Sequence, residues 1–217
     1  MTAGHVIQEI EERGLSVTIG KVINNILHHY PAEKFDIFPD TDLAIIKTKK
    51  EISDAKQFMW NTKKLIMLDE IRTVGFPHAI DFETGKLSIR SFKGYIVSET
   101  TFDRLESKPP SYELSFSAPQ GLSGAPLFPP SKMIPIIKGY ILGSSQIKIP
   151  ILIGEEQETE EKGFKKIIES YDVSSYGVAI QTQSIIHIEY EILNGKLLDF
   201  LESNKLTRNF PRGDKFF

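Results

Sequence analysis

The feature that most limits how this chain can fold is a series of short apolar segments separated by turn residues. Two of them, 87–92 and 112–117, alternate apolar and polar residues, which is typical of strands with one buried face. Apolar residues at helical spacing occur in only a few places, at 6–10 and after Ile188. Many short strands with few helices predict an all-β barrel fold. The segments expected to form strands are 17–19, 35–38, 65–68, 71–77, 87–92, 94–98, 112–117, 133–137, 139–143 and 176–180.

The composition excludes several classes of function. The 217 residues are 40% hydrophobic and 25% charged, which is ordinary for a globular protein. The formal charge of −3 predicts no electrostatic attraction to nucleic acid or anionic membranes. No apolar run reaches membrane-spanning length, and no signal peptide is visible. The absence of cysteine excludes disulfide and thiolate chemistry, and we expect a cytoplasmic protein.

A serine between two glycines is the clearest candidate for a chemical group. Gly121 and Gly124 remove Cβ crowding on both sides of Ser123, which permits a tight turn with inward N–H groups and an open Oγ. Pro126 discourages a helix, and the apolar residues after it begin a strand. The motif predicts a serine in a loop between strands, where it forms either an ordinary surface turn or a catalytic nucleophile.

Three short motifs resemble those of the chymotrypsin-like (trypsin-like) serine peptidases of bacterial type. Residues 121–126, Gly-Leu-Ser-Gly-Ala-Pro, resemble the nucleophile loop of that family. The sequence Thr-Ala-Gly-His, ending at His5, resembles its histidine element, and Asp-Leu-Ala-Ile, beginning at Asp42, resembles its aspartate element. The order His, Asp, Ser is the one that the family requires. The resemblance implies a triad of His5, Asp42 and Ser123.

Other titratable residues near these motifs are given lesser roles. Asp36 and Asp40 compete with Asp42 for the third position of the triad, but only Asp42 leads into an aliphatic run expected to form a buried strand. The adjacent His28 and His29 have no spaced partner of metal-ligand type, so we expect no metal site there.

The activity implied by the resemblance is that of a serine endopeptidase. Ser123 Oγ attacks the scissile carbonyl, His5 takes and returns the proton, and Asp42 holds the imidazole in the required tautomer. The backbone N–H groups of Gly121 and Ser123 form the oxyanion hole. Such an enzyme needs no cofactor, and its partner is a protein or peptide substrate.

The specificity pocket implied by the resemblance has no fixed charge. Ser117 stands where tryptic members carry an aspartate, so we expect small or medium apolar residues at the cleaved position. The walls of this pocket are placed at Tyr140, Gly143 and Gly177. Leu122 replaces the aspartate that pairs with a newly cut N-terminus in digestive members, so activation by proteolysis is not expected.

The start of the sequence departs from the resembled family, in which several strands precede the histidine. His5 follows Met1 by only four residues. Three interpretations are open: the true start lies upstream, another chain supplies the missing strands, or the first barrel is incomplete. The predicted fold is two antiparallel barrels of the six-stranded type, the first N-terminally incomplete, with a C-terminal helix. We divide the chain into 1–62 (first barrel and linker), 63–188 (second barrel) and 189–217 (helix and tail).

Two other functions are alternatives. An α/β-hydrolase would use Ser123 with the later Asp172 and His187, but its motif needs a glycine where Ala125 stands and a helix where Pro126 stands. A catalytically silent module that keeps the barrels is the second alternative, and its groove would take an extended peptide by strand addition.

Overall fold

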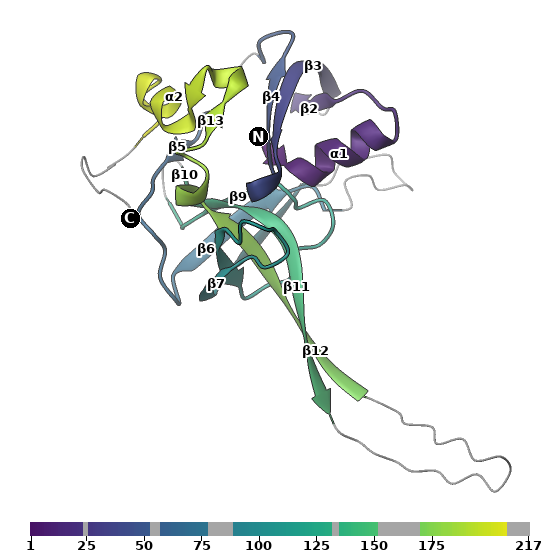
Figure 1. Ribbon diagram of the computed structural model, residues 1–217, viewed down its shortest axis with the longest axis vertical. Helices are drawn as coiled ribbons and strands as arrows, with labels where there is room; N and C mark the ends of the chain where they lie inside the picture. Colours follow the sequence, from purple (N-terminus) through teal and green to yellow (C-terminus); the bar gives the residue numbers. More distant parts are fainter. Residues whose placement is uncertain (24–25, 53–56, 78–88, 132–134, 152–169, 208–217) are drawn as a thin grey trace, which may run out of the picture.

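The computed structural model describes residues 1–23, 26–52, 57–77, 89–131, 135–151 and 170–207 (Figure 1). These residues form a closed six-stranded barrel, an open four-stranded sheet, some two-stranded pairs and two α-helices. The predicted all-β fold with an incomplete first barrel is therefore confirmed. Parts of the predicted strands, 87–88 and 133–134, and the end of the predicted tail, 208–217, lie outside the described residues.

The closed barrel is antiparallel throughout. Its strands are β6 (Glu70–Gly75), β7 (Arg90–Thr101), β8 (Pro110–Leu114), β9 (Pro126–Phe128), β11 (Gly139–Ile151) and β12 (Ser170–Gln181). They pair in the order β11-β12-β8-β7-β6-β9, and β9 pairs again with β11. Since successive side chains of a strand face opposite sides, Ile71 and Thr73 are buried while Arg72 is exposed. Beyond the barrel, β11 and β12 continue as a two-stranded ribbon (Figure 1).

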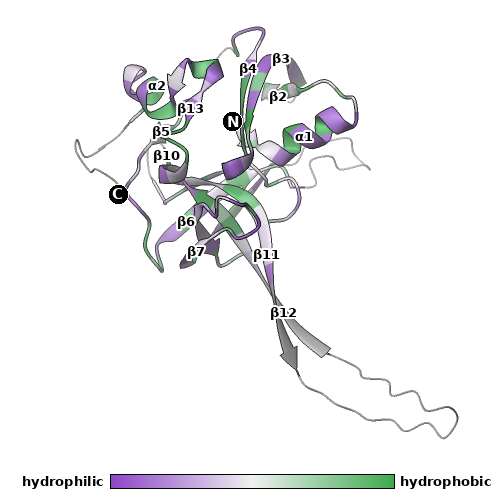
Figure 2. Ribbon diagram, viewed as in Figure 1, coloured by the Kyte–Doolittle hydropathy of each residue, from purple (hydrophilic) through white to green (hydrophobic). Residues whose placement is uncertain are grey.

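The open sheet forms half of a barrel. Its strands are β1 (Thr2–Ala3), β4 (Leu43–Thr48), β3 (Ile26–Phe38) and β2 (Thr18–Ile23), paired in the order β1-β4-β3-β2. Helix α1 (Gly4–Glu12) follows β1 directly. The apolar side of α1 packs Ile7 with Val17 and Ala44, whereas its glutamates are exposed (Figure 2).

The half-barrel and the closed barrel share one apolar core. Leu43 and Ile45 of β4 cluster with Tyr140 and Leu142 of β11 and with Ile180 of β12. The C-terminal part of the chain adds buried residues to this core from α2 (Leu197–Ser203) and from the hairpin of β13 (Glu189–Tyr190) and β14 (Gly195–Lys196). The predicted C-terminal helix is α2, whereas the apolar residues at 190–193, also at helical spacing, form the end of β13 and a 3-10 turn.

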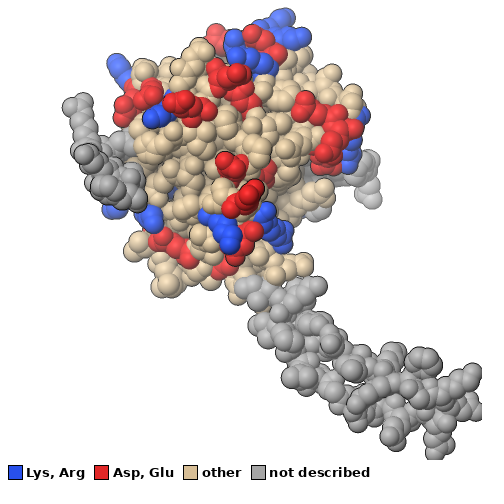
Figure 3. Space-filling view, viewed as in Figure 1, with Lys and Arg blue, Asp and Glu red and all other residues tan. Residues whose placement is uncertain are grey.

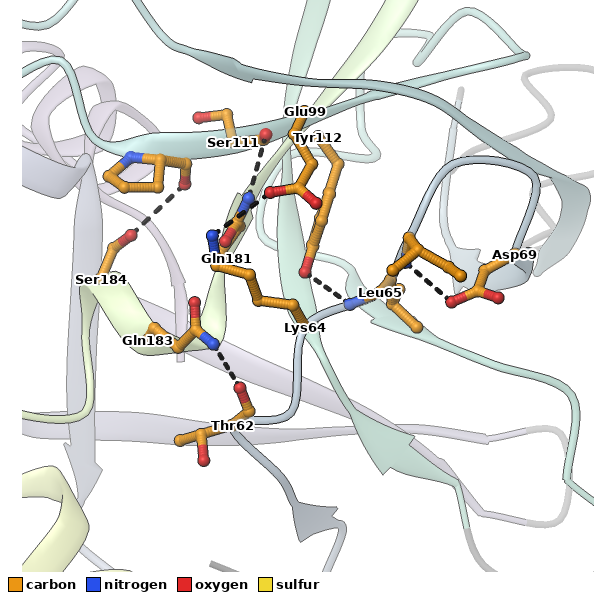
Figure 4. Close-up of polar contacts among 12 residues, drawn as sticks. Thr62, Lys64, Leu65, Asp69, Glu99, Ser111, Tyr112, Gln181, Gln183 and Ser184 are labelled. Atoms are coloured by element: carbon orange, nitrogen blue, oxygen red, sulfur yellow. Dashed lines mark hydrogen bonds and ion pairs between the residues drawn. The ribbon is translucent and has the colours of Figure 1, made fainter. Parts of the chain in front are cut away.

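The segment that connects the two barrels is held by one side chain of β8 and one from the turn that follows β12 (Figure 4). Tyr112 Oη accepts a hydrogen bond from Leu65 N–H at 2.9 Å, and Gln183 Nε2 donates to the carbonyl of Thr62. The remaining short elements are β5 (Met59–Trp60), parallel to β10 (Ile136–Ile137), and the 3-10 turns η1 (Pro39–Thr41), η2 (Thr182–Ser184) and η3 (Glu191–Leu193).

Two predicted strands differ from the structure. Residues 65–68 form a turn, in which Asp69 N–H donates to Ile66 O at 3.0 Å and Leu68 has a φ of 71°. Gly94 does not begin a new strand but lies inside β7. A glycine is needed there for close packing and not for a turn, since a Cβ would be 2.6 Å from Ser115 Oγ.

Candidate active site

The pairing of β1 with β4 brings His5 next to Asp42. Ala3 lies opposite Leu43, so α1 begins beside the first residue of β4. The Gly4 N–H donates to the Asp42 carbonyl at 2.8 Å. The first turn of α1, which carries His5, is therefore fixed against the residue that precedes β4.

The Asp42 carboxylate contacts His5 with both oxygens. Oδ1 accepts the backbone N–H of His5 at 2.6 Å, and Oδ2 lies 2.6 Å from Nδ1 of the ring. Asp42 caps η1 in the left-handed region, with a φ of 49°, a conformation that aspartate tolerates better than most residues. Because Nδ1 faces a carboxylate, the neutral ring carries its proton there and leaves Nε2 as the acceptor.

The pairing of His5 with Asp42 makes the stability of the fold depend on pH. The hydrogen bond to Asp42 raises the pKa of His5; burial opposes the rise, and Glu9 adds a smaller attraction. The protonated ring therefore stabilises the fold below its unfolded pKa of about 6.5, and this contribution is lost as pH rises through the folded pKa. We expect the free energy of unfolding in urea to fall over this interval, and Asp42→Asn to remove the fall. Equal pH dependence in the two proteins would contradict this expectation.

The loop that carries Ser123 is anchored to the closed barrel. Gly124 N–H donates to Ile141 O at 2.7 Å, and Ile141 N–H donates to Ala125 O at 2.8 Å. The side chain of Leu122 is fully buried in the barrel core. Ser123 therefore stands on a loop that is fixed by both its main chain and its neighbouring side chain.

Close packing requires both glycines of this loop. Gly121 and Gly124 have φ values of 92° and 83°, in the left-handed region. A Cβ at Gly121 would lie 2.6 Å from Phe76 O, and one at Gly124 would lie 2.6 Å from Ala3 N and from Thr2 Cα. The serine loop is thus in direct contact with β1, the strand that leads into α1.

The hydroxyl of Ser123 points to β11. Its Oγ donates to Leu142 O at 3.0 Å, and among the described residues no hydrogen bond joins it to His5. Leu142 lies at an irregularity of β11, where the register with β12 shifts between Ile141 and Gly143. The sequence held no signal for this acceptor, since any residue supplies a carbonyl.

Two main-chain donors beside Ser123 are available. The N–H groups of Gly121 and Ser123 have no hydrogen-bond acceptor within the described parts of the chain. Between them, Leu122 N–H donates to Pro119 O at 3.1 Å. Within the described residues, the N–H groups of Gly121 and Ser123 are therefore not used by the fold itself.

Three of the predicted pocket residues lie on adjoining segments. Ser117 Oγ donates to Ser175 O at 3.1 Å, and Gly177 N–H donates to Phe116 O at 2.6 Å. Gly143 faces open space, with no atom within 4 Å of the position that a Cβ would take. Hydrogen bonds thus hold Ser117 and Gly177 together at β12, and β11 carries Gly143 beside them.

Tyr140, the fourth predicted pocket residue, is placed differently. Its side chain is buried in the core between the two halves, and its hydroxyl donates to the carbonyl of Thr41. Burial raises the pKa of Tyr140 far above its ordinary value, so the hydroxyl stays protonated and a donor.

The other titratable residues considered for the site either bind elsewhere or, among the described residues, belong to no group that could hold a metal ion. The carboxylate of Asp36 accepts Ile192 N–H at 2.7 Å, and His28 and His29 lie exposed on β3. In the described ranges, no three His, Cys, Asp or Glu side chains are placed to hold a metal ion. The antiparallel barrel excludes an α/β-hydrolase with Asp172 and His187, because that fold needs strands alternating with helices.

The charge distribution and the helices bear on the predicted absence of nucleic-acid and membrane binding. Acidic and basic side chains are interspersed on the face seen in Figure 3. None of the helices in the described residues has the length and apolar character to cross a bilayer.

The comparisons with known proteins found similarity in structure but not in sequence. No protein-family model matches the chain, and no curated protein matches it by sequence. Among solved structures, the MamO protease domain from Magnetospirillum magneticum, in its apo form, is similar with a TM-score of 0.56 and 11% identity, over 87% of this chain and 82% of that one. At this low sequence identity, the similarity shows a shared fold and not a shared activity. The chain therefore has a protease-like fold of the chymotrypsin-like double-barrel type, with its first barrel open.

Proposed function

We propose that the chain is a serine endopeptidase in which His5, Asp42 and Ser123 form the catalytic triad. The observation that carries the proposal is the pairing of His5 with Asp42 at 2.6 Å, on the helix that follows β1, and β1 is the strand against which the serine loop packs. The two carboxylate contacts orient the ring, and the left-handed glycines hold Ser123 half-buried with its hydroxyl on Leu142 O. The His–Asp contact of the triad is thus in place, and the hydrogen bond from Ser123 to His5 is what the proposal adds.

The chemistry follows from the placement of these groups. In this reaction Ser123 Oγ leaves Leu142 O and donates to Nε2 of His5, the ring nitrogen that acts as the base. As Oγ attacks the carbonyl carbon, the proton passes to Nε2 and Asp42 stabilises the imidazolium. The oxyanion accepts from the N–H groups of Gly121 and Ser123 until the peptide C–N bond breaks and the imidazolium gives its proton to the leaving amine. In enzymes of this kind, one such N–H donor contributes about 3 kcal/mol to transition-state stabilisation. Water then hydrolyses the acyl-enzyme, with His5 again as the base.

The proposed substrate is an extended polypeptide. From Gly143 onward, β11 pairs with β12 alone among the described residues, so its other edge is open beside Ser123. An open edge of this kind takes a peptide as an added strand. Ser117 and Gly177 bring no charge to the pocket, which favours an apolar residue at the cleaved position.

Digestion of a mixed peptide library tests this function and its specificity. We expect cleavage after small or medium apolar residues, read by mass spectrometry, and none by Ser123→Ala, which keeps the loop but lacks the nucleophile. Cleavage only after Arg or Lys would contradict the uncharged pocket, and cleavage that persists in Ser123→Ala would contradict the assigned nucleophile.

A peptide-binding module without turnover is the second candidate. One observation favours it: the Ser123 hydroxyl donates its hydrogen bond to the carbonyl of Leu142 and not to His5. The same open edge of β11 would bind the peptide. Library peptides retained by the intact chain in a pull-down, with no cleavage product, distinguish this function from the first.

A further inference from the structure

The hydroxyl of Tyr140 connects the two halves of the proposed active site. Tyr140 lies on β11 of the closed barrel, opposite Pro126, and Pro126 follows Ser123 by only three residues. Its ring crosses the shared core with 5% of the residue exposed, and its hydroxyl donates to Thr41 O in the half-barrel. Thr41 is the residue before Asp42.

This hydrogen bond holds the peptide group on which the orientation of Asp42 depends. The carbonyl of Thr41 and the N–H of Asp42 belong to the same peptide plane. Tyr140 holds its oxygen, and Asp42 N–H donates to Pro39 O at 3.2 Å at the other side. The φ angle of Asp42 is the rotation that follows this plane, and at its value of 49° both carboxylate oxygens contact His5.

A second hydroxyl of the closed barrel holds the same turn. Ser107 Oγ, in the connection between β7 and β8, donates to the carbonyl of Asp40. Ser107 is exposed, whereas Thr41 is buried. The hydrogen bond from Tyr140 is therefore the one that water replaces least readily when it is lost.

We propose that Tyr140 is a positioning residue that sets the Asp42 carboxylate on His5 and keeps this pair in register with Ser123. It touches no reacting atom, and it acts through the peptide group of Thr41. The effect on catalysis rests on the proposed peptidase function. The effect on His5 does not, because the ring pairs with Asp42 whether or not the chain cleaves peptides.

Tyr140→Phe, compared with Tyr190→Phe, tests this role. Tyr190 is a matched control: it is buried in the same core, but its hydroxyl donates to Ile185 O at 2.9 Å and does not reach the turn before Asp42. Each change removes one buried hydroxyl, so a general loss of stability appears in both variants. The readouts are the pKa of His5 by NMR, with the signal assigned from His5→Gln, and kcat and KM on a cleaved peptide.

In Tyr140→Phe we expect the pKa of His5 to fall towards about 6.5, the value of an unpaired ring. We expect kcat to fall about tenfold with KM unchanged, since a shift of the carboxylate misplaces the base but not the substrate. Tyr190→Phe should leave the pKa and kcat as in the wild type. An unchanged pKa in both variants, or equal changes in both, overturns the positioning role.

Two further arms keep the test decisive. If the chain cleaves no peptide, the peptidase proposal fails, and the His5 titration alone still supports or overturns the role of Tyr140. If Tyr140→Phe does not fold, Tyr140→3-fluorotyrosine carries the test, because its more acidic hydroxyl is a stronger donor. The pKa of His5 should then stay at least as high as in the wild type, and a fall in a folded protein overturns the proposal.

Discussion

An Asp42→Asn variant is expected to lose about 10⁴-fold in kcat while its fold is retained. Asparagine tolerates the left-handed φ of 49° at this position, so η1 keeps its conformation. Its amide also still offers one oxygen to the His5 N–H. The missing charge, however, no longer favours the ring with a proton on Nδ1, and Nε2 ceases to be the base.

The measurement is kcat on a peptide from the library, with the unfolding midpoint recorded for both proteins. Asp36→Asn is the matched control, because Asp36 lies on the neighbouring strand β3 and its carboxylate binds Ile192 N–H, not His5. It should keep wild-type kcat. A loss of similar size in both variants would mean that the effect comes from the sheet and not from the pairing with His5.

Gly124→Ala is expected to have the largest combined effect on stability and activity. Its Cβ would meet Ala3 N and Thr2 Cα at 2.6 Å, and the main chain would carry an alanine at a φ of 83°. The left-handed conformation costs about 1 kcal/mol and the overpacking about 2 kcal/mol more. Separation of the serine loop from β1 by about 1 Å lowers the rate about 100-fold.

Gly14→Ala separates the backbone strain from the close contact. Gly14 also has a positive φ, of 67°, but nothing lies within 4 Å of its Cβ position. We expect a loss of about 1 kcal/mol by urea unfolding and unchanged kcat. If Gly124→Ala were no more damaging than Gly14→Ala, the contact between the serine loop and β1 would have no role in the site.

The strands that the sequence predicted best are those with one buried face. The alternation of apolar and polar residues alone predicted the strand at 112–117. In the structure, this segment forms the end of β8 and the chain that leads on to the serine loop. Pro31 misled the same reasoning. A proline between two short apolar segments indicates a turn, but Pro31 lies inside β3 opposite Thr18, the first residue of β2. A missing N–H at the end of a pairing costs little, so proline is tolerated there.

The arrangement of the candidate site was predictable only where local motifs determine it. Glycines on both sides of Ser123 predicted the tight turn between strands that carries it, because the conformation they permit is a property of the loop itself. The hydrogen bond of its half-buried hydroxyl to Leu142 O was not predictable from the motif. The contact of Tyr140 with Thr41 joins residues far apart in the sequence. Its buried hydroxyl depends on how two barrels pack, and no local pattern specifies that.

Labelling with a fluorophosphonate probe tests most directly whether Ser123 is an activated nucleophile. We predict one adduct, located on Ser123 by mass spectrometry, no adduct in Ser123→Ala, and labelling at least about 100-fold slower in His5→Ala. No adduct in the wild-type chain, or labelling at the same rate in His5→Ala, would contradict a catalytic centre built from these residues.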